Sequence, residues 1–206
     1  ELKNEKDTKK LLLEAEYIDA DGAGITGGDP LSVWRRTKKY IALLKDAFGQ
    51  DFHIHLYTSG LENEEHIPDL VSAGLDEIRF HPLPSDWGKM DTSGIKNSIK
   101  NALDTNVDVA IEIPAMPEME MQILKMIKWA DSNGVRWVNL NELEYSERNC
   151  DALNNRDFTV KDDISAAVKG SQKTAYTVID KISEDNLKIG VHYCSSSFKD
   201  GIQLTN

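Results

Sequence analysis

The amino-acid sequence predicts an α/β fold with parallel strands, and two observations carry this prediction. Short runs of β-branched, aliphatic and aromatic residues alternate with stretches whose apolar residues recur every three or four positions, an order typical of parallel sheets. These strand–helix units recur about every 25–30 residues. Because the expected strands are short and evenly spaced, we favour a partial (βα) barrel of the TIM type over a doubly wound sheet.

Residues that favour element ends bound each expected strand and helix. Trp34 to Phe48 has apolar residues at helical spacing, and Gly49 follows where a glycine commonly ends a helix. Asp29 is expected to cap this helix, with Pro30 in its first turn. In chain order, we expect helix 9–20, strand 22–26, helix 34–48, strand 52–58, helix 64–73, strand 76–81, helix 93–104, strand 107–113 ended by Pro114, helix 118–131, strand 135–140, an irregular stretch 141–161, a mostly helical stretch 162–183 that Gly170 can interrupt, and strand 187–193.

Length and composition predict one domain over residues 1–206, with 1–20 as a leading helix and 162–206 as a C-terminal helix and strand. The formal net charge of -11 disfavours binding to bulk nucleic acid. No apolar run approaches the ~20 residues of a membrane span, and the polar start does not look like a signal peptide. Two cysteines are too few for a disulfide framework, so we expect a cytoplasmic protein.

Polar residues gather where the expected strands end, which is where α/β barrels bind their ligands. Few of them are nucleophiles and many can form hydrogen bonds, which suits a site that grips a polar ligand and leaves the reaction to a cofactor. Glu112 lies between two isoleucines, and the pattern leaves open whether it points into the barrel or outward. The segments concerned are 27–29, 58–60, 79–81, 112–114 and 139–144.

The sharpest motif is Gly-Ile-Thr-Gly-Gly-Asp-Pro-Leu at positions 24–31, between a strand and a helix. A diglycine there leaves backbone groups bare, so a ligand can approach closely. This motif resembles the Gly-Gly-Glu motif of the radical S-adenosylmethionine (radical SAM) family, with Asp29 in place of Glu. Residues 52–60 are similar to that family's third strand and residues 109–117 to its fifth. The subgroup we suggest is related to pyruvate formate-lyase activating enzyme.

The resemblance implies a six-unit (βα) partial barrel that binds S-adenosylmethionine and a [4Fe-4S] cluster. It implies that Gly27, Gly28 and Asp29 hold the methionyl amino group and that Arg79 or His81 faces ribose or carboxylate. Segments 113–115 and 139–141 would border the adenine. The implied reaction forms a 5′-deoxyadenosyl radical that abstracts hydrogen from an unknown substrate. No acid, base or nucleophile is assigned, and the expected cofactor-binding residues are Gly27, Gly28, Asp29, Pro30, Thr58, Ser59, Arg79, His81, Glu112, Asn139 and Asn141.

The chain departs from that family in its cysteines. The Cys-x3-Cys-x2-Cys loop that holds the cluster is absent, and Cys150 and Cys194 lack its spacing. We therefore expect an incomplete first β/α unit, with the cluster ligands in a missing N-terminal segment. On this interpretation the chain alone is inactive.

Two other functions stay open at this point. His53 and His55 share one side of their strand, and with His81 they could bind a metal as in a barrel hydrolase, although packed or surface histidines explain the pair as well. A catalytically empty barrel that binds a ligand or partner is the other alternative. An uncovered barrel edge would make a homo-oligomer possible.

Overall fold

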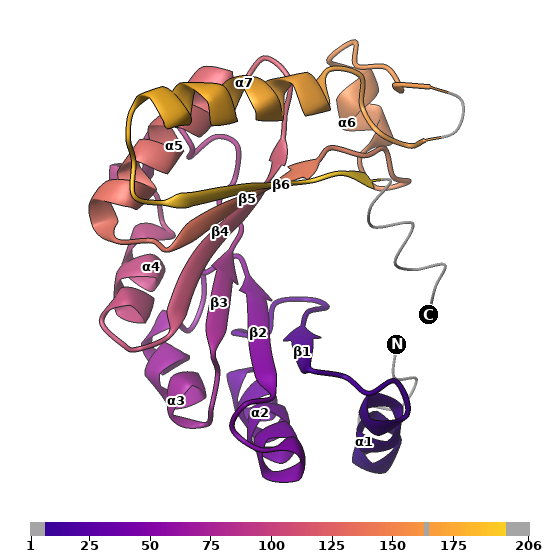
Figure 1. Ribbon diagram of the computed structural model, residues 1–206, viewed down its shortest axis with the longest axis vertical. Helices are drawn as coiled ribbons and strands as arrows, with labels where there is room; N and C mark the ends of the chain where they lie inside the picture. Colours follow the sequence, from indigo (N-terminus) through magenta and orange to yellow (C-terminus); the bar gives the residue numbers. More distant parts are fainter. Residues whose placement is uncertain (1–6, 163–164, 197–206) are drawn as a thin grey trace. The chain divides into compact units, whose positions relative to one another are not determined.

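A computed structural model describes residues 7–162 and 165–196 (Figure 1). The chain divides into two compact units, which are described separately below. The first unit runs to Phe80 and also includes Asn97–Val109, whereas the second includes His81–Lys96 and the chain from Ala110 onward. The expectation of one domain over residues 1–206 stays a prediction.

The first unit holds three parallel strands, bonded in chain order from β1 through β2 to β3. The register places Gly22 beside His53 and His55 beside Glu77. The elements of this unit are α1 (Thr8–Tyr17), β1 (Gly22–Ile25), α2 (Trp34–Phe48), β2 (His53–Thr58), η1 (Glu64–His66), α3 (Ile67–Ser72), β3 (Glu77–Phe80) and most of α4 (Lys96–Leu103).

Strand β2 shows why this sheet has two different faces. Ile54, Leu56 and Thr58 are buried, whereas the alternate residues His53, His55 and Tyr57 are more accessible. Side chains on a strand alternate between faces, so one face joins the apolar core and the other is lined by polar and aromatic groups. The core side continues into α2, α3 and β3 through Ile41, Leu44, Ile67, Leu70, Ile78 and Phe80, all nearly or fully buried.

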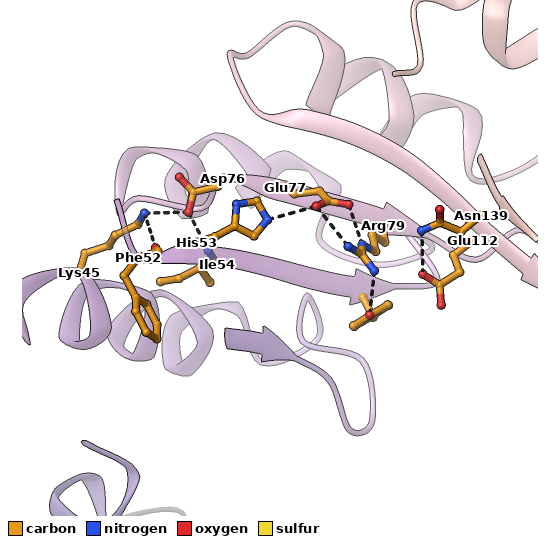
Figure 2. A network of polar contacts seen from close by, with 10 residues as sticks. Lys45, Phe52, His53, Ile54, Asp76, Glu77, Arg79, Glu112 and Asn139 are labelled. Atoms are coloured by element: carbon orange, nitrogen blue, oxygen red, sulfur yellow. Dashed lines mark hydrogen bonds and ion pairs between the residues drawn. The ribbon is translucent and has the colours of Figure 1, made fainter. Parts of the chain in front are cut away.

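A buried lysine connects the segments that lead into the strands of this unit. Lys45 comes from α2, and its side chain is 3% exposed. Its Nζ donates to the carbonyls of Gln50 and Phe52, both at 2.8 Å, and to Asp76 Oδ2 at 2.7 Å. Asp76 Oδ2 also accepts from the backbone N–H of Ile54 at 2.7 Å (Figure 2). The ammonium thus joins the end of α2 to the segments that precede β2 and β3.

The second unit also has three parallel strands in chain order, β4, β5 and β6. Ile111, Ile113, Val138 and Leu140 are buried with apolar side chains of α5 and α7. The elements are η2 (Met90–Thr92), most of β4 (Asp108–Ala115), α5 (Glu120–Asn133), β5 (Trp137–Glu142), α6 (Cys150–Asn154), α7 (Ser171–Glu184) and β6 (Gly190–Cys194). The predicted α/β class with parallel strands is confirmed.

The structure corrects three expectations about element ends. Asp29 does not cap α2 and Pro30 is not in its first turn, because α2 begins at Trp34 with Val33 as its N-cap residue. A turn intervenes, and Thr37 Oγ1 donates to the carbonyl of Pro30 at 2.8 Å. Strand β4 also continues past Pro114 to Ala115.

The segment before α7 is the largest correction. Residues 165–170 are not helical, and α7 begins only after Gly170, whose φ is +93°. Val168 is fully buried, its N–H donates to the Leu143 carbonyl at 2.7 Å, and it forms a β-bridge with Val160. The stretch 141–161 is not wholly irregular either, since it contains α6. The predicted helix also covered residues 163–164, which lie outside the described residues.

No helix in the described ranges has the length and hydrophobicity that a membrane span requires.

Candidate functional site

The diglycine turn after β1 is open. Gly27 has a φ of +110°, a conformation that L side chains rarely adopt. A Cβ atom built on Gly27 or on Gly28 would meet no other heavy atom within 4 Å. The turn therefore exposes its backbone, as the sequence predicts.

The two glycines make a matched pair for a test of this backbone. Gly27→Ala is expected to lower the free energy of unfolding by about 1–2 kcal/mol, because alanine is strained at a positive φ. Gly28→Ala should change it by about 0.5 kcal/mol or less, since the φ of Gly28 lies outside the left-handed region and the added methyl group has room. Urea unfolding followed by circular dichroism measures both. Equal losses would show that the turn does not depend on the φ of Gly27.

Asp29 joins this turn to the end of β2. Its Oδ1 accepts hydrogen bonds from Thr58 Oγ1 at 2.7 Å and from the backbone N–H of Leu31 at 3.0 Å. Its Oδ2 accepts from the backbone N–H of Ser59 at 2.8 Å and from Ser59 Oγ at 2.5 Å. Burial raises the pKa of Asp29, but the hydrogen bonds from Ser59 and Thr58 outweigh burial and hold the pKa below its ordinary value.

A cavity of about 470 Å³ borders the same turn. Backbone and side chains of β1 and the turn form one wall, and α2 and Leu11 of α1 form the rest. The lining is mainly apolar, with polar contributions from Asp29, Ser32, Arg36 and Tyr40. The strand end and turn of this unit thus border a space large enough for a small molecule.

A row of polar side chains crosses the accessible face of β2 and β3 (Figure 2). Glu77 lies at its centre, and its side chain is 3% exposed. His53 Nε2 lies 3.2 Å from Glu77 Oε2, and Arg79 Nε donates to Glu77 Oε1 at 2.6 Å. Arg79 Nη1 also donates to the Tyr57 hydroxyl at 3.0 Å. This row fixes the guanidinium group of Arg79 from two sides.

The Glu77 carboxylate makes the stability of the fold depend on pH. Burial raises the pKa of Glu77, but its hydrogen bond and ion pair with Arg79, together with His53, outweigh burial and lower the pKa below 4.5. A folded pKa below the unfolded one stabilises the fold above the unfolded value, and this stabilisation is lost as the pH falls through the folded pKa.

We therefore expect the free energy of unfolding to decline steeply below about pH 4.5, and Glu77→Gln to flatten that decline. The same change at exposed Glu147 serves as the control and should leave the acid limb as in the wild type. Urea titrations at a series of pH values measure both. An acid limb that is the same in Glu77→Gln and in the wild type would contradict the assignment.

In the second unit, Glu112 points to the same side of the sheet as two asparagines. Asn141 Nδ2 donates to Glu112 Oε1 at 2.8 Å, and Asn139 Nδ2 lies 3.4 Å from Oε2 (Asn139 appears in Figure 2). Ile111 and Ile113 are buried on the other side. The side chain of Glu112 therefore lies on the face of the sheet opposite the buried Ile111 and Ile113, together with Asn139 and Asn141.

The structure sorts the predicted site residues into groups. Asp29 accepts hydrogen bonds from Thr58 and Ser59 at the end of β2, and Gly27, Gly28 and Pro30 lie in the same turn as Asp29. Arg79 belongs to the Glu77 row, His81 directly follows β3, and Glu112, Asn139 and Asn141 form the amide–carboxylate group of the second unit. The binding role assigned to these residues stays a prediction.

The geometry gives no support to a hydrolase metal centre. Within the described part of the chain, no group of three or more His, Cys, Asp or Glu side chains could hold a metal ion. His53 and His55 do share a face, with ring centroids 5.9 Å apart, but His53 is paired with Glu77.

Sequence reasoning missed Glu77 and Tyr57 as members of the polar row. A signal was present, because Glu77 and Arg79 are two residues apart on a strand and so share a face. Tyr57 likewise follows His53 and His55 at spacing two. The alternation rule that paired the two histidines would have found both residues.

Comparison with known proteins gives these observations a context. A curated protein of Methanocaldococcus jannaschii, provisionally named a glycyl-radical enzyme activating enzyme, is 42% identical over 202 residues, which is 96% of this chain and 52% of that protein. The crystal structure of Streptococcus suis SuiB bound to S-adenosylmethionine matches 95% of this chain and 44% of that one, with a TM-score of 0.64 and 12% identity. The predicted resemblance to the radical SAM family is confirmed.

The similarity to the M. jannaschii protein covers nearly the whole chain, but the chain spans only about half the length of that protein. At 12% identity the likeness to SuiB shows the fold alone, and it agrees with the predicted partial barrel. No family model matches the sequence.

Proposed function

We propose that this chain is the core of a radical SAM enzyme and that it binds S-adenosylmethionine at the carboxyl ends of β1 and β2. One observation carries the proposal: the Gly27–Gly28 turn is open, and Asp29 fixes it to Thr58 and Ser59. The amino-acid part of the ligand bears an ammonium group, whose N–H groups can donate hydrogen bonds to backbone carbonyls. The M. jannaschii relative and the ligand in the SuiB crystal support the same cofactor.

Arg79 belongs to the same unit as the diglycine turn and would hold another part of the ligand. Arg79 offers a guanidinium group whose orientation Glu77 and Tyr57 fix, which suits a ribose hydroxyl or a carboxylate. Glu112, Asn139 and Asn141 belong to the second unit, and their binding role stays a prediction. When bound and reduced in this family, S-adenosylmethionine supplies a 5′-deoxyadenosyl radical for hydrogen abstraction.

The residues of this chain do not fit an iron–sulfur cluster. Such clusters are usually held by several cysteine thiolates, and the sequence has only Cys150 and Cys194. The proposal therefore places the ligands of a [4Fe-4S] cluster outside these 206 residues, in a longer protein. The name of the relative favours a protein substrate that carries a glycyl radical when activated. Self-association stays a prediction.

The test is calorimetric titration of the chain with S-adenosylmethionine. We expect saturable binding that is lost in Gly28→Val, because the new side chain fills the open space beside the turn. Gly88→Val is the matched control, since Gly88 is also exposed, has an ordinary φ and lies in another loop. In parallel, a version extended at its N-terminus is reconstituted anaerobically and its iron content is measured. Failure of both forms to bind the ligand would refute the proposal.

A further inference from the structure

The segment between β2 and α3, residues 59–66, is held against the start of α2. Near its middle, the side chain of Asn63 donates to the carbonyl of Leu31 at 3.3 Å. At its end, the imidazole ring of His66 stacks on the indole ring of Trp34, with ring centroids 3.7 Å apart and an angle of 18° between the ring planes. All of these residues belong to the first unit. The stack and the hydrogen bond together fix this segment beside the residues that join β1 to α2.

Two carboxylates contact the imidazole ring of His66. Its Nδ1 lies 3.2 Å from Asp69 Oδ2, and its Nε2 lies 3.6 Å from Glu65 Oε1. The other oxygen of Asp69 accepts from Lys38 Nζ at 2.9 Å. The hydrogen bonds from Lys38 and His66 hold the pKa of Asp69 below its ordinary value, so this carboxylate keeps its charge at neutral and mildly acidic pH. The His66 side chain is 27% exposed, so protons from the solvent can reach it.

The other charged groups around the stack come from α2 and η1. Arg35 of α2 packs over the Trp34 ring, with its guanidinium carbon 4.5 Å from the ring centroid. Glu64 of η1 lies two residues before His66, and the neutral side chain of Asn101, from α4, lies 3.4 Å from its carbonyl oxygen and donates to it. Within the part of the chain that the structure describes, both of the charged groups in direct contact with the imidazole are acidic.

We propose that the Trp34–His66 stack is a proton-dependent contact that sets how firmly residues 59–66 are held on the start of α2. Imidazole is the side chain that ordinarily changes its charge between about pH 5 and pH 8. When the ring of His66 gains a proton, it gains ion pairs with Asp69 and Glu65 and a cation–π contact with Trp34, none of which the neutral ring has. Protonation therefore tightens the stack, and loss of the proton loosens it.

The effect of the proton extends to the residues that follow β1. The backbone N–H of His66 donates to the carbonyl of Asn63 at 3.0 Å, so the two residues close one short turn. The side chain of Asn63 in turn holds the carbonyl of Leu31. A tighter stack thus keeps Asn63 on Leu31 at mildly acidic pH, and a looser stack weakens this hydrogen bond at higher pH. The inference concerns the free protein and is independent of the proposed function.

The test is a pH titration of the ligand-free chain, followed by heteronuclear NMR between about pH 5 and pH 8. The reporter is the amide nitrogen of Ser32, because it belongs to the same peptide group as the Leu31 carbonyl. We expect its chemical shift to follow the ring signals of His66 and the indole signals of Trp34 with one common midpoint. In His66→Gln, which cannot gain the charge, this change at Ser32 should be lost.

His192→Gln is the matched control, since His192 is an exposed histidine on β6 of the second unit, and Ser32 should titrate in it as in the wild type. Asp69→Asn should shrink the change at Ser32, because the charged ring then lacks the nearer of its two carboxylates. Circular dichroism at both ends of the pH range checks that each variant folds. Asp69→Asn decides the test if His66→Gln does not fold, and an undiminished change in it would then count against the inference.

Two further results would overturn the inference. The first is a Ser32 shift that stays constant in the wild type while His66 titrates, because the proton would then have no effect on the residues after β1. The second is a change at Ser32 that is the same in His66→Gln as in the wild type, because another group would then cause it. No sample contains S-adenosylmethionine, so neither result bears on the proposed function.

Discussion

Trp87→Ala is expected to lower the free energy of unfolding by about 3–5 kcal/mol. Trp87 is fully buried in the second unit, and its indole Nε1 donates to the carbonyl of Pro82 at 2.9 Å. The substitution leaves a cavity and removes the hydrogen bond that fixes the loop after β3. Equilibrium urea unfolding, followed by far-ultraviolet circular dichroism, measures the loss.

Trp129→Ala provides the matched control. Trp129 is on α5, is only partly buried, and its Nε1 contacts Asp91 Oδ1 at 3.2 Å near the surface. Its removal should cost about 1 kcal/mol or less. Comparable losses for the two tryptophans would contradict the central place of Trp87 in the packing of this unit.

Lys45→Met is expected to lower the free energy of unfolding by about 2–4 kcal/mol. Methionine matches the shape of the lysine stem but gives no donor to the carbonyls of Gln50 and Phe52, and it leaves Asp76 without its cation. Breaking a buried pair on one side is costly because the remaining charge loses its partner. The measurement is again urea unfolding, at neutral pH.

Lys38→Met is a control on the same helix. Lys38 pairs with Asp69 at 2.9 Å, but both side chains are about 40% exposed. Solvent screens such a pair, so its loss should change the stability by about 1 kcal/mol or less. A loss for Lys45→Met no larger than that for Lys38→Met would show that burial of Lys45 adds nothing.

The order of strands and helices could be predicted because each element carries its own periodicity. The residues of β2 alternate between the core and the polar face, and α2 repeats its buried positions every three or four residues, so local sequence is enough. Gly49 and Gly134 end α2 and α5 with positive φ, as expected of glycines at those places.

The predictions that were wrong concern elements whose ends depend on contacts between residues far apart in the sequence. The carboxylate of Asp29 is bonded to Thr58 and Ser59, some 30 residues later, and α2 begins only at Trp34, after an intervening turn. Similarly, Val168 forms a bridge and a hydrogen bond with residues 8 and 25 positions earlier, which overrides the helical tendency of its own segment. Lysine is usually a surface residue, and the sequence does not show that the folded chain provides three acceptors for the buried ammonium group of Lys45.

The openness of the diglycine turn could be predicted, because it follows from two residues that lack side chains. The row through Glu77 could have been predicted from strand alternation alone. The hydrogen bonds that Thr58 and Ser59 donate to the Asp29 carboxylate could not, since they join residues about 30 positions apart in the sequence.

The alternation along β2 has a consequence for how such a protein can change. Ile54 and Leu56 are fully buried, whereas the interleaved His53 is exposed and His55 and Tyr57 are only partly buried. Exchanging the second set therefore removes less apolar burial than exchanging the first. Substitutions on the polar face of β2 therefore disturb the apolar core less than substitutions on its buried face, so the two faces can diverge under separate selective pressures.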